Sequence, residues 1–136
     1  MKYLGVDFGQ RKIGLAIGDD GGRVAVPFGV VFGGLQEVLK VIKQEGVEAL
    51  VVGLPVPEAH QKQTQLELTL AFKEKLKTES GLPTYAVDEQ FSSTEARRVQ
   101  HEFGAKAEED ALAAMIILQA YFDEGSMGVE QYSDQP

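Results

Sequence analysis

Four carboxylates stand where the sequence indicates the end of a strand or the start of a helix. Asp7 ends the apolar run KYLGVD, Asp88 and Glu89 follow the run TYAV, and Asp110 precedes the apolar stretch ALAAMIIL. Each has an ordinary structural explanation. A strand-end carboxylate often forms a turn or is solvated, and a helix-start carboxylate compensates the helix dipole. Shared chemistry requires that the fold bring them together.

Gathered at one edge of a sheet, these carboxylates would bind a hard cation. Clustered negative charges repel one another unless a cation lies among them. The chain has no cysteine and only two histidines, and oxygen ligands on their own select Mg²⁺ or Mn²⁺. Two such ions activate water and stabilise the leaving oxygen in phosphodiester cleavage. The carboxylates therefore predict metal-dependent hydrolysis of a phosphodiester.

The elements that would position them begin with three strands. Lys2 to Asp7, Lys12 to Gly18 and Arg23 to Phe32 are apolar segments joined by short turn sequences, a pattern that favours an antiparallel meander. In the second segment large aliphatic residues alternate with small or polar ones, as in a strand whose two faces differ.

The rest of the chain alternates helices with strands. Helical spacing predicts a helix over Leu35 to Glu45, and the apolar run Val47 to Leu54 is typical of a parallel strand buried on both faces. The further predicted elements are a helix from Thr64 to Ser80, a strand from Thr84 to Asp88, a helix from a capping box at Ser92 to Phe103, and a helix from Glu109 to Asp123.

This order predicts an α/β fold: a five-stranded mixed sheet, with an antiparallel meander and parallel strands, flanked by helices. Ligand sites in such sheets lie beyond the carboxyl ends of the parallel strands, where Asp7 and the Asp88–Glu89 pair stand. The small residues Ala113 and Ala114, after Asp110, would let the last helix approach the sheet closely. With 136 residues, we expect a single domain over 1–124 and a flexible tail over 125–136.

Composition narrows the class of partner. The net charge of −8, from 13 basic and 21 acidic residues, argues against a protein that coats nucleic acid through bulk electrostatics. It is compatible with an enzyme that contacts few phosphates near a divalent cation. No apolar run reaches the roughly 18 residues that span a bilayer, and no signal-peptide pattern is present. The sequence therefore predicts a cytoplasmic protein that does not enter a membrane.

The motifs and their order resemble the YqgF/RuvX family of the RNase H-like superfamily, described as pre-16S rRNA nucleases or Holliday-junction resolvase-like proteins. The resemblance covers residues 1 to 123. It rests on five blocks in the family's order: Asp-x-Gly with Ile-Gly-x-Ala within 7–16, Val-Val-Gly-Leu-Pro at 51–55, Gly-Leu-Pro at 81–83, Val-Asp-Glu at 87–89, and Asp-x-x-Ala-Ala at 110–114.

The resemblance implies an RNase H-like fold and a nuclease of the two-metal type, with two Mg²⁺ or Mn²⁺ ions when substrate is bound. It implies Asp7, Glu89 and Asp110 as the catalytic, metal-binding triad, with Asp88 as a further candidate ligand. The implied substrate is structured RNA at the 5′ end of pre-16S rRNA, with ribosome association, or else branched DNA. The chain departs from the family at Gln90, where arginine is usual, and in the acidic link 104–109.

Basic residues near these carboxylates are candidates for contacts with the nucleic-acid backbone. Arg11 and Lys12 lie on the predicted hairpin close to Asp7, and Arg97 and Arg98 follow the strand that ends at Asp88. Basic and aromatic residues are not interleaved along the sequence. No such pattern therefore suggests a stacking platform for single strands.

Three alternatives remain open from the sequence. A Holliday-junction cutter would act as a homodimer, since its substrate is symmetric, whereas an rRNA nuclease could be a monomer. A nucleotide-phosphate binder also fits Asp-x-Gly followed by a hairpin, which opens actin-like and sugar-kinase-like ATPases, although those need two such domains. A non-catalytic nucleic-acid or ribosome-associated module is favoured by Gln90, the acidic link and the net charge.

Overall fold

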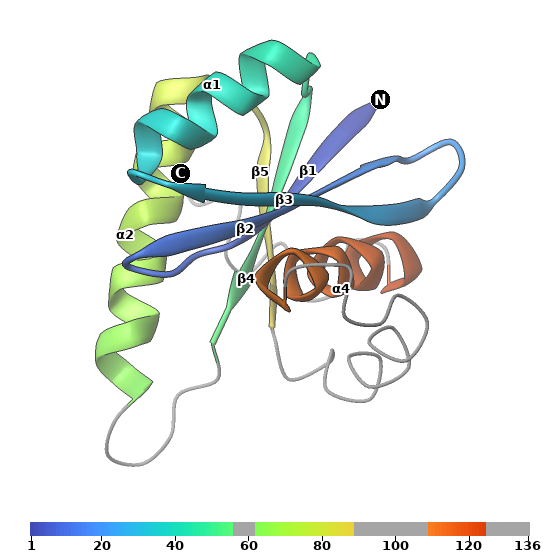
Figure 1. Ribbon diagram of the computed structural model, residues 1–136. Coiled ribbons are helices and arrows are strands. Elements are labelled where there is room, and N and C mark those ends of the chain that lie inside the picture. The colour runs from blue at the N-terminus through green and yellow to red at the C-terminus, as the bar shows by residue number, and fades with distance from the viewer. Residues whose placement is uncertain (56–61, 89–108, 125–136) are drawn as a thin grey trace.

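The computed structural model describes residues 1–55, 62–88 and 109–124, with 62–64 described by backbone only. Its centre is a five-stranded mixed sheet of order β3-β2-β1-β4-β5 (Figure 1). The strands are β1 (Lys2–Asp7), β2 (Lys12–Asp19), β3 (Val24–Phe32), β4 (Ala49–Leu54) and β5 (Thr84–Asp88). β1, β2 and β3 pair antiparallel, and β1, β4 and β5 pair parallel. The predicted fold class is confirmed.

Helices cover both faces of the sheet (Figure 1). α1 (Leu35–Glu45) and α2 (Lys62–Ser80) lie on one face, and α4 (Glu109–Glu124) lies on the other. The helix predicted from Ser92 to Phe103 and the tail over 125–136 lie outside the described residues. In the part that the structure describes, no helix is long and apolar enough to cross a membrane.

Large aliphatic side chains fill the space between the sheet and α1 and α2. Leu4 and Val6 of β1, Ile13 and Leu15 of β2, and Val38 of α1 are fully buried in this cluster. Such residues set the distance between helix and strands through side-chain packing. This face is one of two hydrophobic cores of the molecule, and the other lies under α4.

The face under α4 is built with small residues. β1 and β2 pair in a register that places Gly5 opposite Ala16, Gly14 opposite Asp7 and Gly18 opposite Tyr3. Gly5 lies under α4, because a Cβ there would come within 2.8 Å of Leu118 Cβ and 2.7 Å of the carbonyl oxygen of Ala114. Backbone and helix therefore approach each other where side chains would normally separate them.

Candidate active site

Gly14 allows the first turn of α4 to lie directly against β2. A Cβ on this residue would overlap the carbonyl oxygen of Asp110 and lie 2.9 Å from the Asp110 Cβ. Gly14 is also the cross-strand neighbour of Asp7, and directly opposite residues of an antiparallel pair share a face with their Cβ atoms roughly 5 Å apart. The missing side chain thus lets the start of α4 lie next to Asp7.

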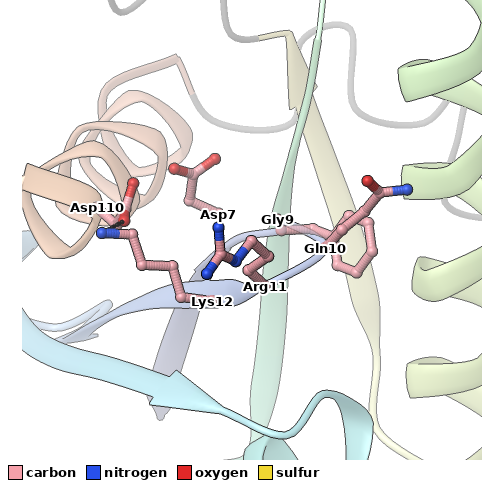
Figure 2. A pocket seen from close by; sticks show the side chains of 7 residues that line it. Asp7, Gly9, Gln10, Arg11, Lys12 and Asp110 are labelled. Carbon is pink, nitrogen blue, oxygen red and sulfur yellow. Dashed lines mark ion pairs between the residues drawn. The ribbon is translucent and has the colours of Figure 1, made fainter.

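Asp7 and Asp110 consequently line one hollow, although they are far apart in the sequence (Figure 2). Its volume is about 350 Å³, and it opens at the β1–β2 turn. The residues that line it are Asp7, Phe8, Gly9, Gln10, Arg11, Lys12 and Asp110. The predicted convergence of a strand-end carboxylate with a helix-start carboxylate is present in the fold.

The turn that forms one wall of the hollow is held by two of its residues. The ring of Phe8 stacks on Phe72 of α2, with centroids 4.5 Å apart and planes 27° apart. A Cβ on Gly9 would meet the carbonyl oxygen of Lys12 at 2.5 Å, so this tight turn requires glycine. These contacts fix the direction in which Arg11 and Lys12 leave the turn.

Lys12 supplies a positive charge inside the hollow. Its ammonium lies 3.1 Å from Asp110 Oδ2, and Figure 2 shows the side chain reaching from β2 toward α4 beside Asp7. Lys12 is 49% exposed and Asp110 28%, so water screens the pair and its net contribution to stability is small. Arg11 lines the same hollow but forms no ion pair within the described residues.

Asp88 lies at the carboxyl end of β5, opposite Leu54 of β4. Side chains alternate along a strand, and Val87 packs in the cluster under α4. Asp88 therefore belongs to the opposite face, that of α1 and α2, whereas Asp7 belongs to the face of α4. Among the described residues no group of three or more aspartate, glutamate, histidine or cysteine side chains gathers at metal-binding distance.

Three further predicted site residues lie outside the described residues. They are Glu89, Arg97 and Arg98. Their predicted roles, as metal ligand and as contacts to nucleic acid, stay predictions. What the structure places is the pair of Asp7 and Asp110 with the two basic residues of the turn.

The chemistry of this donor set fits a hard divalent cation. The side chains of Asp7 and Asp110 offer carboxylate oxygens, and no histidine or cysteine lines the hollow. Oxygen-only donors are those that Mg²⁺ and Mn²⁺ prefer. The Lys12 ammonium beside Asp110 indicates that positive charge is already favoured at this position.

Gly14 is the site residue that the sequence did not single out. Its signal was indirect: Gly14, Ala16 and Gly18 are the small members of the β2 alternation. That pattern does not indicate which helix packs against these small residues. The expectation that small residues of the last helix permit close approach is met at Ala114, whose carbonyl oxygen lies over Gly5.

Comparison with known proteins places the chain among nucleases. The family profile described as "RuvX: Holliday junction resolvase" matches residues 1–124. A protein of Anaplasma marginale (strain St. Maries), named "Putative pre-16S rRNA nuclease", is 33% identical over 132 residues, covering 90% of this chain and 84% of that protein. One of Anaeromyxobacter sp. (strain Fw109-5) with the same name is 35% identical over 133 residues, covering 90% and 97%.

Solved structures share the fold. Thermus thermophilus RuvC, in complex with a Holliday junction substrate, matches with a TM-score of 0.63 and 20% identity over 91% of this chain and 94% of that one. The fowlpox virus resolvase, bound to Holliday junction DNA, matches with a TM-score of 0.55 and 9% identity over 91% and 98%. At these identities the likeness concerns the architecture alone.

Proposed function

Because the chain belongs to the RuvX family, we propose that it is a metal-dependent nuclease that hydrolyses a phosphodiester at the 5′ end of pre-16S rRNA. The observation that carries the proposal is the contact between the start of α4 and Gly14, which brings Asp110 into the hollow that Asp7 lines. The relatives named as pre-16S rRNA nucleases, at 33% and 35% identity, support the choice of RNA.

Asp7, Asp110 and Glu89 are the carboxylates that would hold Mg²⁺ or Mn²⁺. Asp88 lies on the other face of the sheet from Asp7, so the carboxylate that we assign to the end of β5 is that of Glu89, the next residue in the sequence. When bound, the ions would lower the pKa of a water molecule and stabilise the departing oxygen. The protein's part is to hold these oxygens together on rigid elements, two of them placed by β1 and by α4 over Gly14.

The basic residues of the turn would hold the nucleic-acid backbone. Arg11 and Lys12 line the hollow together with the two carboxylates, so a phosphate that approaches the acids meets both cations. Arg97 and Arg98 are the corresponding candidates after β5. Basic residues beside the carboxylates are compatible with a nucleic-acid enzyme whose net charge is −8.

The proposal is tested by cleavage of an RNA that carries the 5′ end of pre-16S rRNA. We expect cutting in Mg²⁺ or Mn²⁺ and none in EDTA. Asp7→Asn should lose at least 100-fold in rate while its circular dichroism stays that of the wild type and its melting temperature without metal does not fall below that of the wild type. Binding of the RNA with no cutting in any divalent cation would contradict the proposal and favour a non-catalytic module. Protection against heat by ATP would instead favour a nucleotide binder.

A second candidate substrate is the four-way DNA junction, which the family's description favours. A symmetric junction needs two active sites, so this activity requires a homodimer, whereas the rRNA activity is open to a monomer. The same assay with a four-way junction, together with the mass in solution, separates the two. An rRNA substrate also implies association with a ribosomal precursor and a cytoplasmic location.

A further inference from the structure

Phe32, the last residue of β3, presents an aromatic ring to water. It is 66% exposed. Among the aromatic side chains that the structure describes, all but Phe28 and Phe32 contact another ring. The ring of Phe8, by contrast, lies in the wall of the hollow and is engaged with Phe72. Phe32 is thus the most exposed of the large apolar side chains that the structure describes.

The strand register places this ring beside Lys12, one of the residues that line the hollow. Phe32 pairs directly with Lys12 of β2, and the two side chains share a face, with their Cβ atoms roughly 5 Å apart. The Lys12 ammonium lies 3.1 Å from Asp110. A basic and an aromatic side chain that are far apart in the sequence are therefore neighbours at the rim of the hollow.

The other exposed apolar residues of β3 belong elsewhere. The β2–β3 register shifts at Leu15/Ala16, so that Gly29 pairs with Leu15 and Pro27 with Ala16. Val26 pairs with Ile17, which packs on the side of α1 and α2, while Phe32 shares the face of Lys12 and Gly14. Val26 and Phe32 consequently lie on opposite faces of the sheet.

The same strand is poorly suited to pair with another strand. Pro27 lies within β3 and has no N–H to donate to a ladder, and next to it the pairing of β3 with β2 shifts register. A second copy of the chain, or an extended peptide, would meet this proline in the middle of the edge. The exposure of Phe32 therefore calls for an occupant that binds a ring rather than a backbone edge.

We propose that Phe32 is a stacking platform for an unpaired base of the substrate, next to the phosphate held at the carboxylate site. The inference rests on the proposed function and names its substrate class more narrowly: nucleic acid with single-stranded nucleotides beside the cut. An aromatic ring stacks on any base, whatever the sequence. The base must be unpaired, because a base within a duplex has both faces covered by its neighbours.

The test compares two RNAs and two phenylalanines. The RNAs are a hairpin with a single-stranded 5′ extension and the same hairpin with a blunt end, and binding is measured by fluorescence anisotropy in EDTA, where no cleavage is expected. Phe32→Leu should weaken binding of the extended RNA about 5- to 30-fold and of the blunt RNA less than 2-fold. Phe32→Tyr, which keeps the ring, should bind both like the wild type.

Phe28→Leu is the matched control, because Phe28 is an exposed phenylalanine of the same strand (42%). It should leave both affinities unchanged. The proposal is overturned if Phe32→Leu binds the extended RNA as tightly as the wild type does, or if it weakens both RNAs equally. It is also overturned if Phe32→Leu turns a dimer into a monomer, since the ring would then be a contact between copies. If Phe32→Leu weakens binding of the extended RNA alone, but the wild type cuts no RNA, the proposed function is refuted while the stacking role of Phe32 is supported.

Discussion

The two faces of the sheet hold their helices in different ways. Toward α1 and α2 the strands present large aliphatic side chains such as Leu4 and Leu15, and packing of these side chains sets the spacing. Toward α4 the strands present Gly5, Gly14 and Gly18: the backbone of α4 lies against Gly5 and Gly14, and the ring of Phe122 lies against Gly18. The first face mainly stabilises the fold. The second also fixes the position of a catalytic candidate, because the residue above Gly14 is Asp110.

The difference suggests that stability and site geometry can be changed separately. A cavity on the aliphatic face lowers the free energy of unfolding and leaves the strands that carry Asp7 in register. An added atom on the glycine face moves the helix and with it a carboxylate. The following predictions test this separation.

The largest loss of stability is expected from Leu15→Ala. Leu15 is fully buried on the face of α1 and α2, and removing such a side chain costs about 4 kcal/mol, through lost burial and the cavity left behind. Urea denaturation should show this loss. Mn²⁺ should still raise the melting temperature by as much as in the wild type, because Asp7 and Asp110 lie on the other side of the sheet from Leu15. If Mn²⁺ did not raise the melting temperature of Leu15→Ala, the proposal that stability and site geometry can be changed separately would be wrong.

A somewhat smaller loss of stability, with loss of the site, is expected from Gly14→Ala. Its Cβ would overlap the carbonyl oxygen of Asp110, so α4 must shift, at a cost of about 3 kcal/mol. The stabilisation by Mn²⁺ should disappear. Gly29→Ala is the control, since nothing lies within 4 Å of the added atom, and it should be neutral or slightly stabilising. Mn²⁺ stabilisation that survives in Gly14→Ala would contradict the role given to Gly14.

Lys12→Gln should change metal affinity more than stability. Its side chain in the ion pair with Asp110 is about half exposed. The free energy of unfolding should therefore change by less than about 1 kcal/mol. Removing a cation that competes for the Asp110 carboxylate should tighten Mn²⁺ binding roughly 3- to 10-fold in calorimetric titration. Arg11→Gln removes the same charge from the same hollow and should change binding less than 2-fold. Equal effects of the two variants would mean that total charge, not the ion pair, matters.

The smallest effect concerns the aromatic end of the α4 face. Tyr121 stacks on Tyr85, with centroids 5.3 Å apart, and burial raises the pKa of its hydroxyl above the usual value of about 10. The unfolded chain then loses this proton at lower pH than the folded one does. Stability is therefore full below about pH 10 and falls as the pH rises further. Tyr121→Phe should flatten this decline in urea titrations, and an unchanged slope would exclude Tyr121 as its source.

Local signals predicted the elements well and their ends less well. β1, α1 and β5 have the bounds expected from their apolar runs and turn residues. β4 was expected from Val47 but begins at Ala49. The reason is that Gly46 adopts a left-handed conformation and the N–H of Val47 bonds to the carbonyl of Ile42. Val47 thus completes the end of α1 before the strand begins.

The site could be predicted in part, for a physical reason. Asp7 and Asp110 were recognisable because strand ends and helix starts are local features of sequence. The role of Gly14 depends on a contact between segments that are far apart in the chain. A glycine in a sequence does not indicate which distant residue it will contact. The position of the Phe32 ring cannot be predicted for the same reason, since only the strand register brings it next to Lys12.

The central claim is that Asp7 and Asp110, joined over Gly14, belong to one divalent-cation site. Calorimetric titration of Mn²⁺ into the wild type, Asp7→Asn and Asp110→Asn tests it most directly. We predict that each substitution weakens Mn²⁺ binding at least 10-fold, while the melting temperature without metal stays equal to that of the wild type or rises. Wild-type affinity in either variant would show that the two carboxylates do not share an ion.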